Sequence, residues 1–332
     1  MPAKCCFMPN VLDSGPMVLL PCPDHIARIR SYFWKYAVCS GEGELNRQFL
    51  SVSQAIRACL AGLLLSAQII PVAADEVDDC LMATGDIQIR GCSVIIITKK
   101  AFGLPIIPKN LAIAYYNRGN AYVQTGNDNN AIEDFTAAIK LDPEAIRAFM
   151  NRGNAYARRK DFVRALADFD SALKFNPKLS KIYLNRGSTF YDKGDYIKAI
   201  TDFNTAINLN PNDDLAYGNR GLAHTAAGYP EKAISDYDNA IRLNPKAGNT
   251  YRNRGLAYIH LKKYDRAIAD FTSAISKDST DAIAYHNRGN AYDEIGKFSQ
   301  AIADYDIAIS LNPGNAYFHL YRGISYHNLG QY

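Results

Sequence analysis

The sequence predicts an all-α protein built as a solenoid of stacked helix–turn–helix units. The first observation is a constant period of 34 residues between glycines that follow an arginine: Gly119, Gly153, Gly187, Gly221, Gly255, Gly289 and Gly323. The second is that apolar residues within each period have the spacing of two amphipathic helices. The third is a proline near the end of most periods: Pro143, Pro177, Pro211, Pro245 and Pro313. Repetition at a fixed period is the signature of a repeat architecture.

The first helix of each unit carries an aromatic and small-residue stripe. With Ala112 as position 1, the first unit has Tyr115 at position 4, Gly119 at position 8 and Tyr122 at position 11. At about 100° per residue, these positions lie on one side of a helix. The later units repeat the pattern with few changes, so this stripe is predicted to face the core.

The second helix of each unit places small residues around a ring. In the first unit these are Ala131 at position 20, Phe135 at position 24 and Ala138 at position 27. The helix is predicted to end at the proline, which lacks a backbone N–H and clashes with the preceding turn. The fifth unit differs, because Ser279 stands at that position.

These residues resemble the tetratricopeptide repeat, whose large, Gly, Tyr, Ala, Phe, Ala and Pro positions match at nearly every offset. The resemblance covers residues 112–332, as six complete 34-residue repeats and a partial seventh. It implies a right-handed superhelix with a concave groove lined by the first helices. That is a binding architecture without a cofactor, so the resemblance implies a non-enzymatic interaction scaffold.

The N-terminal part of the chain, residues 1–111, does not follow the 34-residue repeat. Residues 1–44 show no sustained period and receive no fold; they are predicted to lie upstream of the true start. Residues 45–74 have basic residues, an apolar stretch from 58 to 70 and then Val72-Ala73-Ala74, which is the order of a secretory signal. The apolar stretch is short for a membrane span. Cleavage before Asp75 would give a periplasmic or secreted protein; the alternative is a buried helix of a cytoplasmic protein.

Residues 75–111 form a segment between the signal and the repeats. Cys80 and Cys92 are the only cysteines left after signal removal, so an exported chain is predicted to join them in a disulfide. The segment resembles the degenerate leading repeat of exported bacterial tetratricopeptide arrays. Its β-branched residues 94–97 favour a strand by propensity, which opposes the helical prediction.

The C-terminal end repeats only part of the unit. Residues 316–329 correspond to a first helix, and Gly330-Gln331-Tyr332 match the opening of a second helix. A terminal repeat should present a polar outer face, yet this one carries Tyr317, Leu320, Tyr321, Ile324 and Tyr326. Either the sequence is incomplete or this surface pairs with another chain, and we expect self-association through it.

An asparagine at position 6 is the main candidate for function. It occurs in all six complete units, at Asn117, Asn151, Asn185, Asn219, Asn253 and Asn287. The position lies about 200° from the aromatic at position 4, away from the core stripe. A carboxamide can pair with the N–H and C=O of an extended peptide. The row resembles the asparagine ladder of the O-linked N-acetylglucosaminyltransferase superhelix, which implies polypeptide binding; the alternative is bonding between neighbouring first helices.

Further peptide contacts are expected from nearby positions on the same face. Toward the N-terminal end these are Asn120, Asn154, Arg147, Arg158 and Lys181. Midway the corresponding residues are apolar, so a partner segment with acidic and then apolar residues would fit. Arginine at position 7 and aspartate at position 23 also recur in every complete unit, and we predict structural ion pairs between the two helices.

Composition and motifs exclude several other classes of function. The net charge of +4 does not call for nucleic acid. No catalytic motif is present, and the cysteines and histidines lack metal-ligand spacing. The prediction is a scaffold that binds an extended polypeptide. The alternatives are a self-assembling structural module, or the regulatory region of an enzyme whose catalytic domain is missing from this chain.

Overall fold

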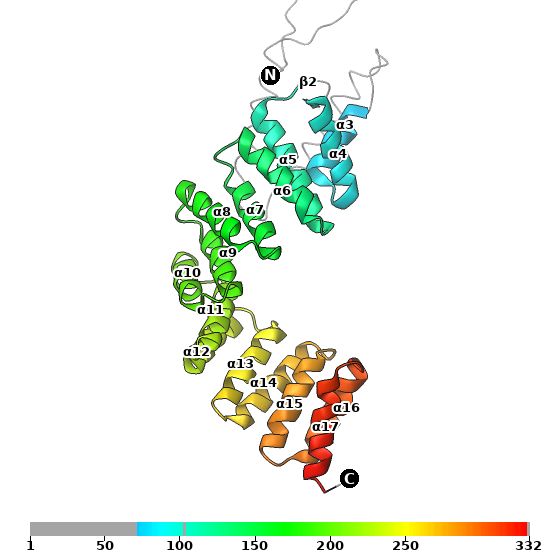
Figure 1. The fold of residues 1–332 in the computed structure, drawn as a ribbon, viewed down its shortest axis with the longest axis vertical. Coiled ribbons are helices and arrows are strands. Elements are labelled where there is room, and N and C mark those ends of the chain that lie inside the picture. The colour runs from blue at the N-terminus through cyan, green and yellow to red at the C-terminus, as the bar shows by residue number, and fades with distance from the viewer. Residues whose placement is uncertain (1–71, 102–103, 331–332) are drawn as a thin grey trace, which may run out of the picture. The chain divides into compact units, whose positions relative to one another are not determined.

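The computed structural model describes residues 72–101 and 104–330, and most of them lie in helices (Figure 1). The leading hairpin consists of α3 (Val72–Met82) and α4 (Gly85–Thr98), followed by the short antiparallel pair β1 (Lys100–Ala101) and β2 (Leu104–Pro105). Six further hairpins follow: α5 (Pro108–Gln124) with α6 (Asp128–Leu141), α7 (Ile146–Arg158) with α8 (Phe162–Phe175), α9 (Ser180–Asp192) with α10 (Tyr196–Leu209), α11 (Asp214–Ala226) with α12 (Pro230–Leu243), α13 (Gly248–His260) with α14 (Tyr264–Lys277), and α15 (Ala282–Glu294) with α16 (Phe298–Leu311). The last described helix is α17 (Ala316–Asn328).

The predicted all-α repeat fold is confirmed, and each 34-residue period forms one hairpin. The predictions for residues 1–44, and for residues 45–71 of the signal segment, lie outside the described residues. Residues 72–74 of that segment form the first turn of α3. Among the described residues, no helix is both long enough and apolar enough to span a bilayer.

The β-branched residues 94–97 lie in helix α4, against their strand propensity. The reason is tertiary packing. Gln88, Cys92 and Ile95 recur at helical spacing, are buried, and face α3 and α5. Burial of that stripe outweighs intrinsic β propensity, which is weak and depends on context.

The aromatic at position 24 is the centre of each hairpin. The rings of Phe135, Phe169, Phe203, Tyr237, Phe271 and Tyr305 are at most 1% exposed, and the alanines at positions 20 and 27 are buried beside them. Small residues around a ring allow the two helices to approach closely. The predicted core pattern is therefore confirmed for all six hairpins.

The second helices end at the same place with or without a proline. Helix α14 ends at Lys277 although Ser279 replaces the proline. The Oδ1 atom of Asp278 accepts a hydrogen bond from the backbone N–H of Thr280 (2.9 Å), and Asn176 and Asn210 make the same turn. An Asp or Asn two residues before such an N–H is a local turn signal. This residue, which the sequence prediction missed, closes the turn in the fifth unit.

The glycine at position 8 is required by the close approach of the ring. A Cβ atom on Gly221 would lie 2.6 Å from Cε1 of Tyr237, whereas a Cβ on Gly218 of the same helix would meet nothing within 4 Å. We therefore expect Gly221→Ala to lower the free energy of unfolding by about 1–3 kcal/mol through overpacking. Gly218→Ala should raise it by about 0.5–1 kcal/mol, because alanine favours helix. Urea unfolding followed by circular dichroism measures both, and equal signs would contradict the packing explanation.

The stack bends toward its first helices. Direct contacts join α5 with α7, α7 with α9, α9 with α11, α11 with α13, α13 with α15, and α15 with α17. No comparable contacts join successive second helices among the described residues. Because the first helices approach one another more closely than the second helices do, they lie on the inner side of the stack. The residues of the first helices that point away from the hairpin cores therefore form one continuous surface.

Candidate functional site

We use the term first-helix face for positions 2, 6, 9 and 13 of α5, α7, α9, α11, α13 and α15. The six asparagines at position 6 are all half-buried on this face, and their neighbours at position 13 are exposed. None of the six carboxamides has a buried nitrogen or oxygen atom without a partner. The asparagines are thus not sealed within the core of the array.

Three of the six carboxamides are tied to the preceding hairpin. In each case the side-chain amide donates to an oxygen of the neighbouring unit. Nδ2 of Asn117 donates to the carbonyl of Cys80 (3.2 Å), Nδ2 of Asn151 to Oδ1 of Asn120 (2.7 Å), and Nδ2 of Asn219 to Oγ of Ser188 (3.4 Å). The alternative anticipated from the sequence, bonding between first helices, therefore holds for part of the row.

The other three carboxamides, on Asn185, Asn253 and Asn287, have no hydrogen bond to another described residue. The residue at position 9 of the preceding unit explains two of these cases. Asn151 and Asn219 meet a polar side chain there, whereas Asn253 and Asn287 follow units in which Leu222 and Leu256 stand at position 9. A leucine side chain offers no hydrogen-bond acceptor, so neither amide group finds a partner at that position.

The charged residues predicted for this face differ in their surroundings. Lys181 and Arg147 are exposed on the first turns of α9 and α7. Arg158 is 45% exposed, but its guanidinium is paired with the carboxylate of Asp128 at 2.5 Å. It therefore already neutralises an acidic group of the preceding hairpin. Asn154, at position 9, is half-buried on the first-helix face, in the unit before the one that carries Asn185.

The arginine at position 7 links each hairpin to the one before it. In the third unit Nε and Nη2 of Arg186 bond both carboxylate oxygens of Asp202 at 2.7 Å, and Nη1 bonds Asp170 of the preceding hairpin at 2.6 Å. The hydrogen bond with Asp202 raises the pKa of Arg186 above its usual value. Equivalent pairs join Arg118 to Asp134, Arg152 to Asp168, Arg220 to Asp236, Arg254 to Asp270 and Arg288 to Asp304. The predicted ion pairs are confirmed, and their link to the preceding hairpin is a new finding.

The leading hairpin joins the first-helix face through its cysteines. The Sγ atoms of Cys80 and Cys92 lie 2.08 Å apart, which is the length of a disulfide. The carbonyl of Cys80 accepts hydrogen bonds from Asn117 and from Nε2 of Gln88 (3.1 Å). The disulfide therefore joins α3 to α4 at the residue, Cys80, whose carbonyl bonds Asn117, the first asparagine of the row.

A polar cluster lies between α15, α16 and α17. The carboxylate of Asp293 accepts hydrogen bonds from Tyr305 (2.8 Å) and Ser325 (2.7 Å). His286 packs against the Phe318 ring, its Nδ1 atom is buried without a partner, and burial lowers its pKa. Sequence reasoning missed this cluster, because its members come from three helices and share no motif.

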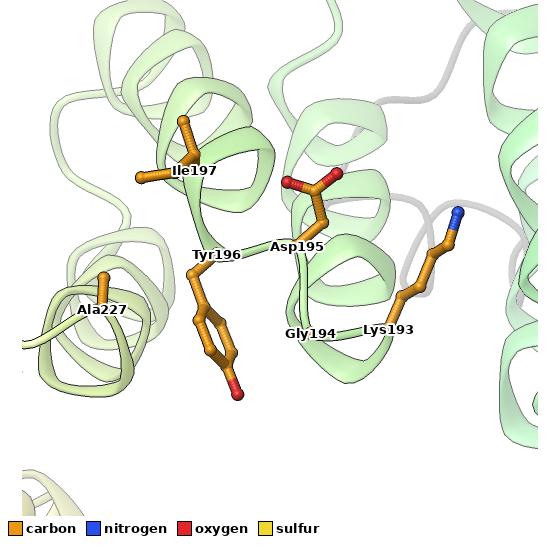
Figure 2. A pocket seen from close by; sticks show the side chains of 6 residues that line it. All are labelled: Lys193, Gly194, Asp195, Tyr196, Ile197 and Ala227. Atoms are coloured by element: carbon orange, nitrogen blue, oxygen red, sulfur yellow. The ribbon is translucent and has the colours of Figure 1, made fainter.

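A depression of about 500 Å³ lies at the turn between α9 and α10, next to the end of α11 (Figure 2). It is lined by Lys193, Gly194, Asp195, Tyr196, Ile197 and Ala227. Figure 2 shows the Tyr196 ring projecting away from the Asp195 carboxylate, so the polar groups do not converge on one point. Within the described part of the chain, no group of three His, Cys, Asp or Glu residues could hold a metal ion.

A stack of helical hairpins with a continuous face of first helices is the architecture of a repeat-type binding protein. The chain belongs to the tetratricopeptide repeat family. Models described as TPR repeat match residues 119–160 and 187–228, and models described as Tetratricopeptide repeat match residues 146–179, 226–282 and 282–315. Proteins of this family generally mediate protein–protein interactions and are typically non-catalytic scaffolds. No curated protein matches the chain by sequence.

Solved structures share the fold. A tetratricopeptide repeat protein from Parabacteroides merdae is 25% identical with a TM-score of 0.55, over 66% of this chain and 87% of that protein. The Pseudomonas aeruginosa pilF protein is 17% identical with a TM-score of 0.58, over 65% and 99%. A chain of the APC/C heterotetramer Cut9–Hcn1 is 18% identical with a TM-score of 0.57 over 76% of this chain. The match spans about half, 51%, of that longer chain.

Proposed function

We propose that this protein is a non-enzymatic scaffold that binds an extended polypeptide along the first-helix face. The observation that carries the proposal is the row of carboxamides on Asn185, Asn253 and Asn287, which reach solvent without a bond to another described residue. Asparagine is a mediocre helix former, and the side chains of these three hold no hydrogen bond to another described residue. Pairing with a peptide main chain would use their donors and acceptors.

The energetics require contacts besides the asparagines. Each amide bond adds about 0.5–1.5 kcal/mol net, whereas association costs about 4–15 kcal/mol. The face offers Lys181 on α9 and apolar side chains further along, including Leu215, which is 61% exposed, and Ile283, which is 52% exposed. A polypeptide with an acidic part facing α9 and apolar residues facing α11 to α15 would complement this surface.

The proposal is tested with a fluorescent peptide that has an acidic half and a valine-rich half, in both orders. We expect saturable binding to the intact chain, and a loss of about tenfold or more in affinity for the triple variant Asn185→Ala, Asn253→Ala, Asn287→Ala, because three bonds are worth about 1.5–4.5 kcal/mol. Fluorescence anisotropy measures the affinity. The melting temperature should stay the same or rise, since these side chains hold no bond among the described residues and alanine favours helix.

The matched control is Asn129→Ala, which removes an exposed asparagine from the second helix α6. It should leave peptide affinity unchanged. If the triple variant binds the peptides as well as the intact chain does, the row of asparagines is not the binding site. A peptide that binds neither chain would contradict the predicted acidic and apolar character of the partner.

We also propose that the protein is exported. The support is the order of basic, apolar and small residues in positions 45–74, together with the disulfide between Cys80 and Cys92, since structural disulfides persist in oxidising compartments. Export with cleavage predicts a mature chain that begins at Asp75. Mass spectrometry of the N-terminal peptide checks this, and a mature chain that retains residues 45–74 would disprove it.

Self-association is a second candidate function, and the exposed side chains of α17 favour it. Tyr317 is 68% exposed and Leu320 is 56% exposed. Apolar side chains gathered on one helix are typical of an interaction surface.

A further inference from the structure

The contact between the sixth hairpin and α17, which we call the α17 junction, contains polar residues that the earlier units lack. They are His286 at position 5 and Asp293 at position 12 of α15, and Ser325 at position 10 of α17. No earlier unit has a histidine at position 5 or a carboxylate at position 12. The repeat pattern alone therefore does not account for these groups.

A chain of hydrogen-bonding groups leads from His286 to α17. Nε2 of His286 lies 3.2 Å from Nδ2 of Asn290, and Oδ1 of Asn290 lies 2.7 Å from the hydroxyl of Tyr305. The same hydroxyl lies 2.8 Å from the carboxylate of Asp293, which accepts a hydrogen bond from Oγ of Ser325 at 2.7 Å. Because Ser325 is fully buried in α17, this chain joins all three helices of the junction.

The imidazole ring of His286 lies among the rings of α16 and α17. Its centroid is 5.6 Å from that of Tyr305, 4.9 Å from that of Phe318 and 5.1 Å from that of Tyr321. The two tyrosines are the titratable groups against the ring, and Asp293 lies beyond Tyr305. Burial alone lowers the pKa of His286, so no charged group of the described helices around it compensates. The site therefore favours the neutral ring.

The Nδ1 atom of His286 has no acceptor for an additional proton. This atom is buried and has no hydrogen-bond partner among the described residues. A neutral imidazole has one donor nitrogen and one acceptor nitrogen, whereas an imidazolium donates at both. The Asn290 amide can present either end to Nε2, but neither orientation supplies an acceptor to Nδ1. Protonation would therefore create a buried donor without a partner, which is unfavourable.

We infer that the α17 junction is a pH-sensitive latch, which is closed while the His286 ring is neutral and loosens when the ring takes up a proton. The added proton places a charge and an unpaired N–H group between α15, α16 and α17. Separation of α17 from α15 and α16 exposes both to water. Acidification should therefore release α17 while the hairpins further from the ring stay packed.

The direction of the pH effect distinguishes His286 from Asp293. A histidine whose pKa is lowered by folding loses stability as the pH falls through its ordinary value of about 6.5. Burial raises the pKa of Asp293, so ionisation of this carboxyl group costs stability as the pH rises. The two groups act in opposite directions. Loosening on acidification is therefore the effect of His286.

The test measures hydrogen exchange of the full chain by mass spectrometry at about pH 7.5 and about pH 5, on either side of the ordinary imidazole pKa. We expect the protection factors of amides in α17 to fall by about tenfold at the lower pH, equivalent to about 1.4 kcal/mol. Those of α7 to α10 should change less. The variant His286→Phe should remove the fall, because it keeps a ring at the position where α5 has Tyr116.

Three further variants complete the test. His286→Met, with the residue that Met150 provides at position 5 of α7, should also remove the fall. His319→Gln, at an exposed histidine of α17, should retain it. Ser325→Ala should lower protection at both pH values and keep the fall, because it removes the bond to Asp293 but leaves His286 unchanged.

Several results would overturn the inference. Protection of α17 that is unchanged at the lower pH would show that His286 does not control the junction. Protection that rises would show that the neighbouring rings hold the imidazolium. A fall of the same size in both His286→Phe and His286→Met would assign the effect to another group. Loss of the fall in Ser325→Ala would make Asp293 the responsible group.

Discussion

Replacing Phe169 with alanine is expected to lower the free energy of unfolding by about 3–5 kcal/mol, the cost of removing a buried aromatic ring. The ring is fully buried between α7 and α8, where a Cβ on Gly153 would approach it to 3.0 Å. Its cluster also includes Met150 and Ile182. Because Ile182 belongs to α9, the cavity would open at the junction between two hairpins. Chemical denaturation followed by circular dichroism measures the change.

The effect of Phe169→Ala should spread beyond its own hairpin. Repeats of this kind are stable only when stacked, since each one contacts only its neighbours. Hydrogen exchange should therefore accelerate in α7 to α10 more than in α15 to α17. The matched control is Val163→Ala in the same helix α8, at a side chain that is 76% exposed. It should change stability by no more than about 0.5 kcal/mol. Equal losses for the two variants would contradict the assignment of the core.

The second large effect is expected for Asp202→Asn, with a loss of about 3–5 kcal/mol, because the partly buried guanidinium of Arg186 would lose the buried carboxylate that it binds through two hydrogen bonds. Asp202 is 6% exposed and holds two hydrogen bonds from Arg186. Asparagine keeps the shape of the aspartate side chain but removes its negative charge. It also places an amide N–H group against one of the N–H donors of Arg186. Thermal unfolding and urea titration of the variant give the magnitude.

Asp170→Asn is the matched control, since the same Arg186 bonds this second aspartate on the other side. Asp170 is 58% exposed, so water and salt screen the pair, and its loss should cost at most about 1 kcal/mol. Both variants remove one carboxylate from Arg186, so the difference between their losses of unfolding free energy measures the effect of burial. If Asp170→Asn proved as destabilising as Asp202→Asn, the link between hairpins would matter as much as the buried pair within one, which contradicts the prediction.

Most of the fold was accessible from the sequence, because each hairpin is specified by residues that are close along the chain. The period of 34 residues, the aromatic at position 24 and the alanines around it determined which helix sides are buried, and the structure agrees in all six hairpins. Strand propensity was misleading at residues 94–97, because these residues lie in α4, where a buried helical stripe outweighs that propensity. The sequence prediction also missed the turn at Asp278, which does not need a proline.

What only the tertiary structure decided lies between hairpins. The six asparagines are equivalent by position, yet the side chain of Asn151 bonds Asn120 across the junction, while the side chains of Asn253 and Asn287 bond no described residue. Periodicity places a side chain on a helix face but says nothing about the residue that the next hairpin brings against it. The same limit applies to the link from Arg186 to Asp170. The sequence alone determined the repeat and its core through local helical spacing, and packing between repeats determined which of the asparagine side chains bond to a neighbouring repeat.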